Sequence, residues 1–167
     1  MSEIKPYYII IRGPLGIGKS TISKKLAEVL DAKVFHMDHI LQQHGLDQVA
    51  PGAESISAQN FIKAFEIIQK EIEEALTSGK IVIFDACFYH QENITDMQKK
   101  LDWEQKVFTL KAPLETCIKR DSQRKVSYGE DAARAVHNLV SRFDAGIMIE
   151  TQNKSIAETV QEILGFL

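Results

Sequence analysis

The sequence predicts an α/β fold in which a parallel sheet of five strands lies between two layers of helices. Five apolar runs alternate along the chain with segments whose apolar residues recur every three or four positions. The first run leads directly into a glycine-rich loop, and an amphipathic helix follows that loop. Because strands that alternate with helices pair in parallel through right-handed crossovers, we expect a three-layer α/β/α architecture.

The first half of the chain contains three continuous apolar runs, which are typical of strands buried on both faces of a sheet. These strands are expected at residues 7–11, 33–36 and 81–85. Apolar residues at helical spacing predict helices at residues 19–30 and 57–77, and Gly79 ends the second helix. Residues 42–55 contain two glycines and one proline without a clear period, which indicates a loop that could close over a substrate.

The second half continues the alternation. Strands are expected at residues 106–110 and 146–150, and helices at residues 94–101, 114–124, 130–143 and 155–164. Asn93 or Thr95 is expected to start the first of these helices. Ser155 and Glu158 have the spacing of a capping box in front of the last helix.

Composition predicts one domain over residues 1–167. The chain has 167 residues, of which 44% are hydrophobic and 26% charged, enough for a full core. The net charge of −3 argues against a broad basic surface, so binding of extended nucleic acid is not expected.

Cysteine usage and the lack of long apolar runs indicate a cytoplasmic protein. Cys87 and Cys117 form no C-x-x-C pattern, which fits a reducing compartment and two buried small side chains. The N-terminal residues contain no apolar signal segment, and no run approaches the length of a membrane span. We therefore expect no membrane association.

The glycine-rich loop fits the pattern G-x-x-x-x-G-K-[ST] and predicts a bound nucleoside triphosphate. In such a loop, backbone N–H groups and the start of the following helix surround the phosphates. Lys19 is expected to reach the β- and γ-phosphate oxygens, and the Ser20 hydroxyl to bind Mg²⁺. The predicted nucleotide-binding residues are Gly13, Pro14, Leu15, Gly16, Ile17, Gly18, Lys19, Ser20 and Thr21.

Two carboxylates stand near predicted strand ends, where ligands bind in open α/β sheets. Asp85 ends the third strand and is expected to join Ser20 as a Mg²⁺ ligand, directly or through water. The alternative for Asp85 is a helix cap or a solvated side chain. Asp38 follows the second strand and is the candidate base, or orienting group, for an acceptor hydroxyl. Its alternative is the N-cap of a helix over residues 40–44.

Two arginines are candidates for a cationic lid over the transferring phosphoryl group. Arg120 and Arg124 lie four residues apart, so they share one face of a helix that runs into a break at residues 125–129. Guanidinium groups there can stabilise transition-state charge, which makes both candidate catalytic residues. The alternative is that both arginines are exposed and that their charges are balanced by Glu115 and Asp121. We expect a small helical lid at about residues 120–135.

The chain resembles the small P-loop kinases, a group that includes chloramphenicol phosphotransferase, shikimate and gluconate kinases, polynucleotide kinases and zeta-type toxins. The resemblance rests on the loop, on Phe35-His36-Met37-Asp38, and on Leu110 to Glu115 followed by the two arginines. In that group the acidic residue after the second strand orients or deprotonates the acceptor hydroxyl. The resemblance implies the same role for Asp38.

The sequence thus predicts an ATP- and Mg²⁺-dependent kinase that phosphorylates a hydroxyl group of a small acceptor. A nucleotide or nucleoside kinase and a kinase of nucleic-acid ends are alternatives within the same chemistry. A nucleotide-dependent switch that hydrolyses ATP slowly is an alternative from another class, although a switch has no need of an acceptor-side carboxylate such as Asp38. The acceptor, the choice between ATP and GTP, and the oligomeric state are left open by the sequence.

Overall fold

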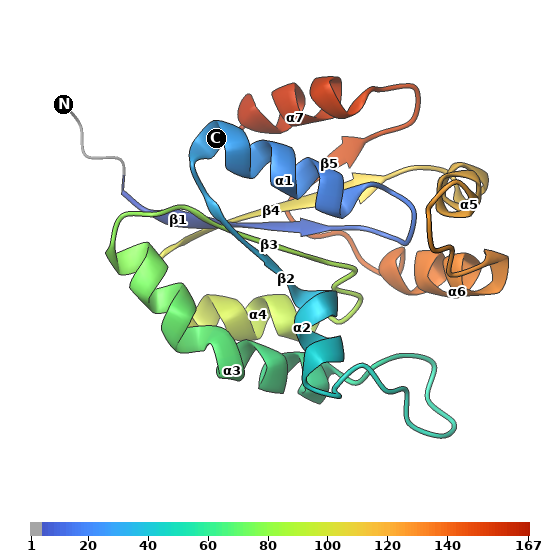
Figure 1. The fold of residues 1–167 in the computed structure, drawn as a ribbon, viewed down its shortest axis with the longest axis horizontal. Coiled ribbons are helices and arrows are strands. Elements are labelled where there is room, and N and C mark those ends of the chain that lie inside the picture. The colour runs from blue at the N-terminus through green and yellow to red at the C-terminus, as the bar shows by residue number, and fades with distance from the viewer. Residues whose placement is uncertain (1–4) are drawn as a thin grey trace.

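Five parallel strands form the centre of the molecule, which a computed structural model describes from residue 5 to residue 167 (Figure 1). β1 (Tyr7–Arg12) lies between β3 (Val82–Ala86) and β4 (Glu104–Lys111). β2 (Lys33–His36) pairs with β3, and β5 (Ile147–Glu150) pairs with β4. The order β2-β3-β1-β4-β5 confirms the predicted five-stranded parallel sheet.

Helices cover both faces of this sheet, as a three-layer fold requires. One face carries α1 (Lys19–Leu30) and α7 (Ile156–Leu164) (Figure 1). The other face carries α2 (Met37–Gln43), α3 (Ala58–Thr77) and α4 (Gln91–Lys100). Ser155 and Glu158 form the predicted capping box in front of α7. The neighbouring strands β1 and β3 thus lead to helices on opposite faces, which opens a crevice at their carboxyl ends.

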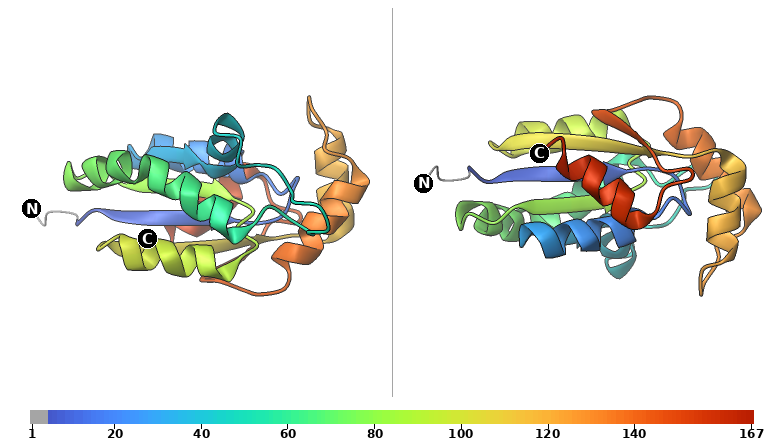
Figure 2. Two further views of the ribbon diagram at one scale, coloured as in Figure 1. Left: turned by 90° about the horizontal axis from the view of Figure 1, so that it is seen from below. Right: turned by 90° about the horizontal axis from the view of Figure 1, so that it is seen from above.

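Two further helices lie across the carboxyl end of the sheet. α5 (Leu114–Ser122) and α6 (Glu130–Val140) pack together, and their axes run across the strand direction (Figure 2). They are joined by residues 123–129, so the predicted break at residues 125–129 lies between these helices and begins two residues earlier than expected. This pair occupies the place expected for a lid.

Two helix starts differ from the prediction. α2 begins at Met37, directly after β2, so its N-cap position belongs to His36 and the alternative interpretation of Asp38 as a helix N-cap is wrong. α4 begins at Gln91 rather than after Asn93 or Thr95. The Asn93 side chain is buried and donates to the carbonyl of Ala58, so it joins α4 to α3 instead of capping a helix.

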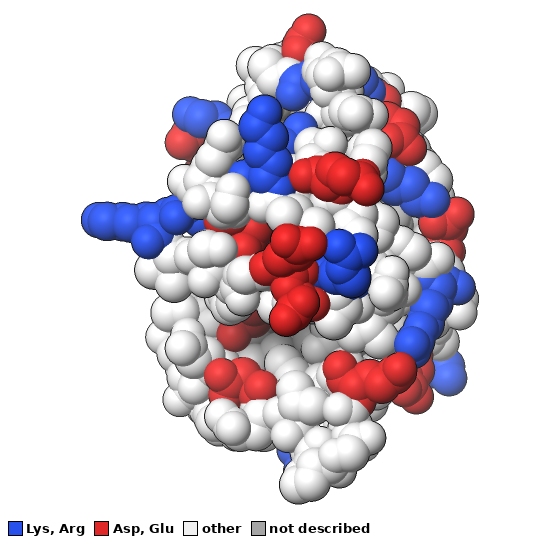
Figure 3. Space-filling model, turned by 90° about the vertical axis from the view of Figure 1, so that its right-hand side faces the viewer, with Lys and Arg blue, Asp and Glu red and all other residues white. Residues whose placement is uncertain are grey.

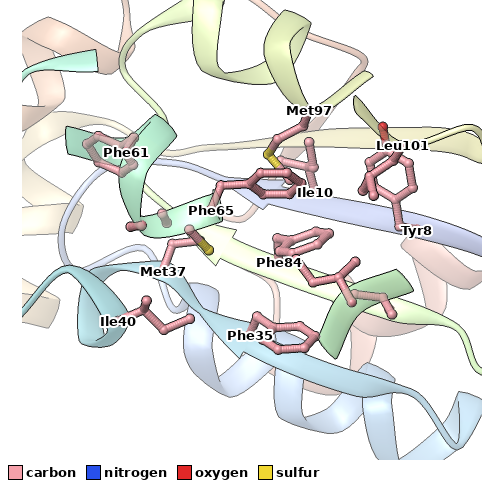
Figure 4. Close-up of a cluster of buried hydrophobic side chains, with 14 of the residues drawn as sticks. Tyr8, Ile10, Phe35, Met37, Ile40, Phe61, Phe65, Phe84, Met97 and Leu101 are labelled. Carbon is pink, nitrogen blue, oxygen red and sulfur yellow. The ribbon is translucent and has the colours of Figure 1, made fainter. Parts of the chain in front are cut away.

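The core has one apolar layer on each face of the sheet. The layer under α2, α3 and α4 includes a group of aromatic rings, in which Phe84 of β3 contacts Tyr8, Phe35 and Phe65 (Figure 4). Met37 and Ile40 of α2 insert into the same layer. The opposite layer lies under α1 and α7. Among residues 5–167, no helix combines the length and apolarity needed to cross a membrane.

Candidate functional site

The glycine-rich loop joins the buried strand β1 to the first turn of α1. Gly16 and Gly18 have φ angles of 78° and 100°, a backbone region that glycine occupies without strain. Lys19 begins the helix and is only 8% exposed, and its Nζ donates a hydrogen bond of 2.9 Å to the carbonyl of Pro14. The loop backbone therefore folds around the side chain that is expected to contact phosphates.

Two loop glycines also allow close approach to neighbouring elements. A Cβ atom on Gly16 would lie 2.3 Å from the carbonyl oxygen of Cys117 in α5. A Cβ atom on Gly13 would lie 3.1 Å from the carbonyl oxygen of Leu110 in β4. Because both oxygens belong to backbone held in regular structure, neither can move aside easily. Gly16 therefore places the loop against α5, a role that the sequence motif does not specify.

One crevice of about 810 Å³ opens beside the loop. It is lined by the predicted nucleotide-binding residues from Leu15 to Thr21, whereas Gly13 and Pro14 are buried beneath the loop. The other predicted site residues line the same crevice: Asp38, Asp85, Arg120 and Arg124. Residues that are far apart in the sequence thus share one space at the carboxyl ends of the strands.

α2 directs Asp38 toward the crevice because the opposite side of the helix is held in the core. Met37 and Ile40 are buried (Figure 4). The helical period therefore leaves Asp38 on the outer face, where it lines the crevice. Surrounding protein raises the pKa of the Asp38 carboxyl, the Lys19 ammonium partly offsets this, and the negative charge of Asp85 adds to it. A raised pKa makes a carboxylate a better proton acceptor.

A histidine holds the second carboxylate in place. Asp85 is 3% exposed, and its Oδ2 lies 2.7 Å from Nδ1 of His36. His36 is the last residue of β2 and stands opposite Asp85 in the parallel register, so the fold itself creates this pair. His36 lines the crevice together with Asp85. The alternative of a solvated Asp85 is wrong.

The two lid arginines have different surroundings. Arg120 donates to the hydroxyl and to the carbonyl of Thr151, each at 3.0 Å, so its guanidinium is held against the chain that follows β5. Arg124 lies 5.3 Å from the centre of the Tyr128 ring, and its Nη1 lies 3.6 Å from Oδ1 of Asp121. Its side chain is 45% exposed. Arg124 is therefore the freer of the two, and its contact with Asp121 matches part of the alternative interpretation.

Asp121 folds the segment between α5 and α6. Its carboxylate accepts hydrogen bonds from the Ser127 hydroxyl at 2.8 Å, from the Gly129 backbone N–H at 3.0 Å, and from the Tyr128 N–H at 3.1 Å. Burial alone would raise the pKa of Asp121, but these bonds outweigh it and leave the pKa lowered. An ionised Asp121 thus holds Tyr128, and with it the surroundings of Arg124.

A buried arginine at the end of β1, directly before the glycine-rich loop, connects this strand to the C-terminal end of α6. Arg12 is fully buried and donates to the carbonyls of Phe88, Val140 and Phe143 at 3.3, 3.0 and 3.1 Å. It also donates to the Thr109 hydroxyl at 3.1 Å, and its guanidinium stacks 4.1 Å from the centre of the Phe143 ring. Burial lowers the pKa of Arg12 to about 10. All of these partners are neutral.

Sequence reasoning missed four residues that shape the site: His36, Thr151, Asp121 and Arg12. Three of them act through partners that lie 30 or more positions away, for example 49 positions between His36 and Asp85, and no local pattern shows such a pair. Asp121 is different, because its partners lie only six to eight residues later in the chain.

Comparisons with known proteins support this description of the fold. The family model described as "AAA domain" matches residues 9–145, which is most of the chain. No curated protein matches the sequence. A sugar kinase from Janibacter has a TM-score of 0.76 at 13% identity, with 96% of this chain and 93% of that chain covered.

Two other solved structures are similar over nearly their whole length. The APS kinase of Mycobacterium tuberculosis, in complex with AMPPNP and APS, has a TM-score of 0.70 at 15% identity and covers 96% of each chain. The shikimate kinase of Bacteroides thetaiotaomicron has a TM-score of 0.68 at 14% identity, with 96% of this chain and 97% of that chain covered. Identities this low show the fold alone. The chain therefore belongs to the AAA domain family and has the fold of the small P-loop kinases.

Proposed function

We propose that this protein transfers the γ-phosphoryl group of ATP to a hydroxyl group of a small acceptor, with Mg²⁺ as its cofactor. One observation carries this proposal: the phosphate loop and the outward-facing Asp38 line the same crevice. A protein that only binds or hydrolyses a nucleotide needs the loop but has no use for a carboxylate on the acceptor side. The kinases among the structural neighbours support the same reaction class.

The residues of the crevice fit the parts of a phosphoryl transfer. Lys19 would exchange its bond to Pro14 for bonds to the β- and γ-phosphates. Ser20 and Asp85 offer oxygen donors on the same crevice, which are the ligands that Mg²⁺ prefers. The cation would neutralise phosphate charge there. The His36 contact orients the Asp85 carboxylate for that purpose.

In the proposed step, the acceptor oxygen bonds to the γ-phosphorus while the bond from that phosphorus to the β,γ-bridging oxygen breaks. ADP leaves with the electron pair, and the hydroxyl proton passes to Asp38. Arg124, the freer lid cation, would contact the transferring group, whereas Arg120 would hold α5 against the chain after β5. The loop over residues 44–57 and the α5–α6 pair would exclude water.

The test is an acceptor screen. Purified protein with ATP and Mg²⁺ is given sugars, nucleosides, amino alcohols and nucleic-acid ends, and ADP release is compared with the rate in water alone. We expect at least one acceptor to raise ADP release, and Lys19→Ala to remove this stimulation. Lys25→Ala, an exposed position on the same helix, is the matched control and should behave as wild type. ADP release that no acceptor stimulates would contradict the proposal and favour a nucleotide-dependent switch.

A further inference from the structure

The crevice is divided into two halves of opposite charge. The basic residues that line it all come from α1, from α5 and the segment directly after it, or from the chain before α7: Lys19, Lys24, Arg120, Arg124 and Lys154. Its acidic residues, Asp38 and Asp85, come from α2 and β3 on the other side. The positive charge of the first half is complementary to the negative charge of a nucleoside triphosphate. The acceptor would then bind in the second, acidic half.

Two segments build this second half, and we call them the acceptor wall: residues 36–62 and 81–98. They are tied together, since His90 Nε2 lies 2.7 Å from the carbonyl of Ile56 and the Asn93 amide donates to Ala58. The aromatic ring of Phe61 also packs against Phe88. Neither segment contains a lysine or an arginine, although together they contain six acidic residues. The side chains of the wall that line the crevice are His36, Asp38, His39, Gln42 and Asp85.

Three arginines on elements next to the wall, Arg12, Arg134 and Arg142, already have partners. Arg12 is fully buried, with bonds from its guanidinium to backbone carbonyls. Arg142 pairs with Glu54 at 3.0 Å, and Arg134 pairs with Glu130 at 2.9 Å. The space-filling view of the carboxyl end shows acidic side chains around its hollow (Figure 3). Among the described residues that line the crevice, no lysine or arginine lies outside the nucleotide half.

We propose that the acceptor is a hydroxyl compound without an anionic group, an uncharged polyol or a hydroxylated amine, and that amines are favoured. This inference rests on the proposed function and specifies its substrate class. A carboxylate or phosphate on the acceptor would lose its hydration beside Asp38 without gaining a charged partner from the wall. An ammonium group would instead form charge-assisted hydrogen bonds with carboxylates. The charge of the wall thus selects against phosphorylated and carboxylated acceptors.

Matched acceptors test this charge selection. D-glucosamine, D-glucose and D-gluconate form one series, and adenosine with its 5′-monophosphate forms another. Further series compare the amine, the neutral and the acid form of a pentitol and of an amino alcohol. We expect kcat/KM to fall by about tenfold or more from the neutral to the anionic member of every skeleton that is used. A wild-type preference for the anionic member of a skeleton would overturn the acceptor class and leave the phosphotransferase intact. Failure of every acceptor would overturn both.

A charge added to the wall provides a second, independent measurement. Gln42→Arg places a guanidinium on the crevice, whereas Gln161→Arg, at an exposed position on α7 outside the wall and the crevice lining, is the control. We expect Gln42→Arg to raise kcat/KM for the anionic member relative to the neutral one by about tenfold, with ATP affinity unchanged. Gln161→Arg should leave the ratio as in wild type. If the ratio of kcat/KM for the anionic and neutral members were equal in all three proteins, charge would not control the specificity. Calorimetric titration with gluconate and with glucosamine measures acceptor binding separately from turnover.

Discussion

Replacing Arg12 by methionine removes the guanidinium that connects the end of β1 to the C-terminal end of α6. The new side chain is apolar and of similar length. Three backbone carbonyls, of Phe88, Val140 and Phe143, would lose the guanidinium as a donor. At about 2 kcal/mol for each buried acceptor left unpaired, this loss costs about 6 kcal/mol. Removing a cation whose pKa burial lowers from 12.5 to about 10 returns about 3 kcal/mol, since one pKa unit corresponds to about 1.4 kcal/mol. We therefore expect a net destabilisation of about 3 kcal/mol.

Urea and thermal denaturation measure this change directly, and the melting temperature should fall by about 9 °C for a chain of this size. Hydrogen exchange should be faster at the C-terminal end of α6 and in the residues directly after it, since the Val140 carbonyl ends the helix and the Phe143 carbonyl follows it. Arg12→Lys keeps a charge but lacks the planar group that serves several acceptors at once, so it should lose nearly as much. Arg134→Met, which removes an exposed arginine from α6, is the control and should change the free energy of unfolding by less than about 0.5 kcal/mol. An Arg12→Met protein as stable as wild type would refute the reasoning.

Two further predictions concern carboxylates. Asp38→Asn should abolish acceptor-stimulated ADP release yet raise the free energy of unfolding at neutral pH. The pKa of this carboxyl is raised in the folded state, so its ionised form opposes folding above the unfolded pKa, and the gain should vanish at about pH 3, where both states are protonated. Asp102→Asn, an exposed position before β4, should change neither quantity. Asp121→Asn should lower the free energy of unfolding at neutral pH and speed hydrogen exchange at residues 127–129. Because the pKa of Asp121 is lowered in the folded state, this loss of stability should shrink as the pH falls through the folded pKa. Unchanged hydrogen exchange at these residues would contradict the role of Asp121.

The sequence was sufficient for the sheet and for the phosphate loop because both depend on local patterns. The apolar runs predicted all five strands, and the glycine spacing predicted the loop between β1 and α1. It was also sufficient to bring Asp38 and Asp85 to one crevice, since Asp85 lies at the end of one strand and Asp38 follows another that ends at the same edge. Whether these residues carry the proposed chemistry is still a prediction.

The contacts that tune the site could not be predicted in the same way. The bond between His36 and Asp85 depends on the register of β2 against β3, and a shift of one residue would remove it. Arg120 was predicted as a free lid cation, but its position is fixed by Thr151, 31 residues later in the chain. The start of α2 was misplaced because a strand that passes directly into a helix leaves no turn signal in the sequence.

The close approach of Gly16 to Cys117 restricts where this molecule can bend. At this point the backbone of the loop and that of α5 leave no room for a methyl group, and the amide of Asp121 lies next to the same spot. The far end of α6 is likewise held, through Arg12. We therefore expect a closing movement over the nucleotide to be confined to residues 122–129, which carry Arg124 and Tyr128. The expected lid is a short flap between two clamped ends rather than a swinging body.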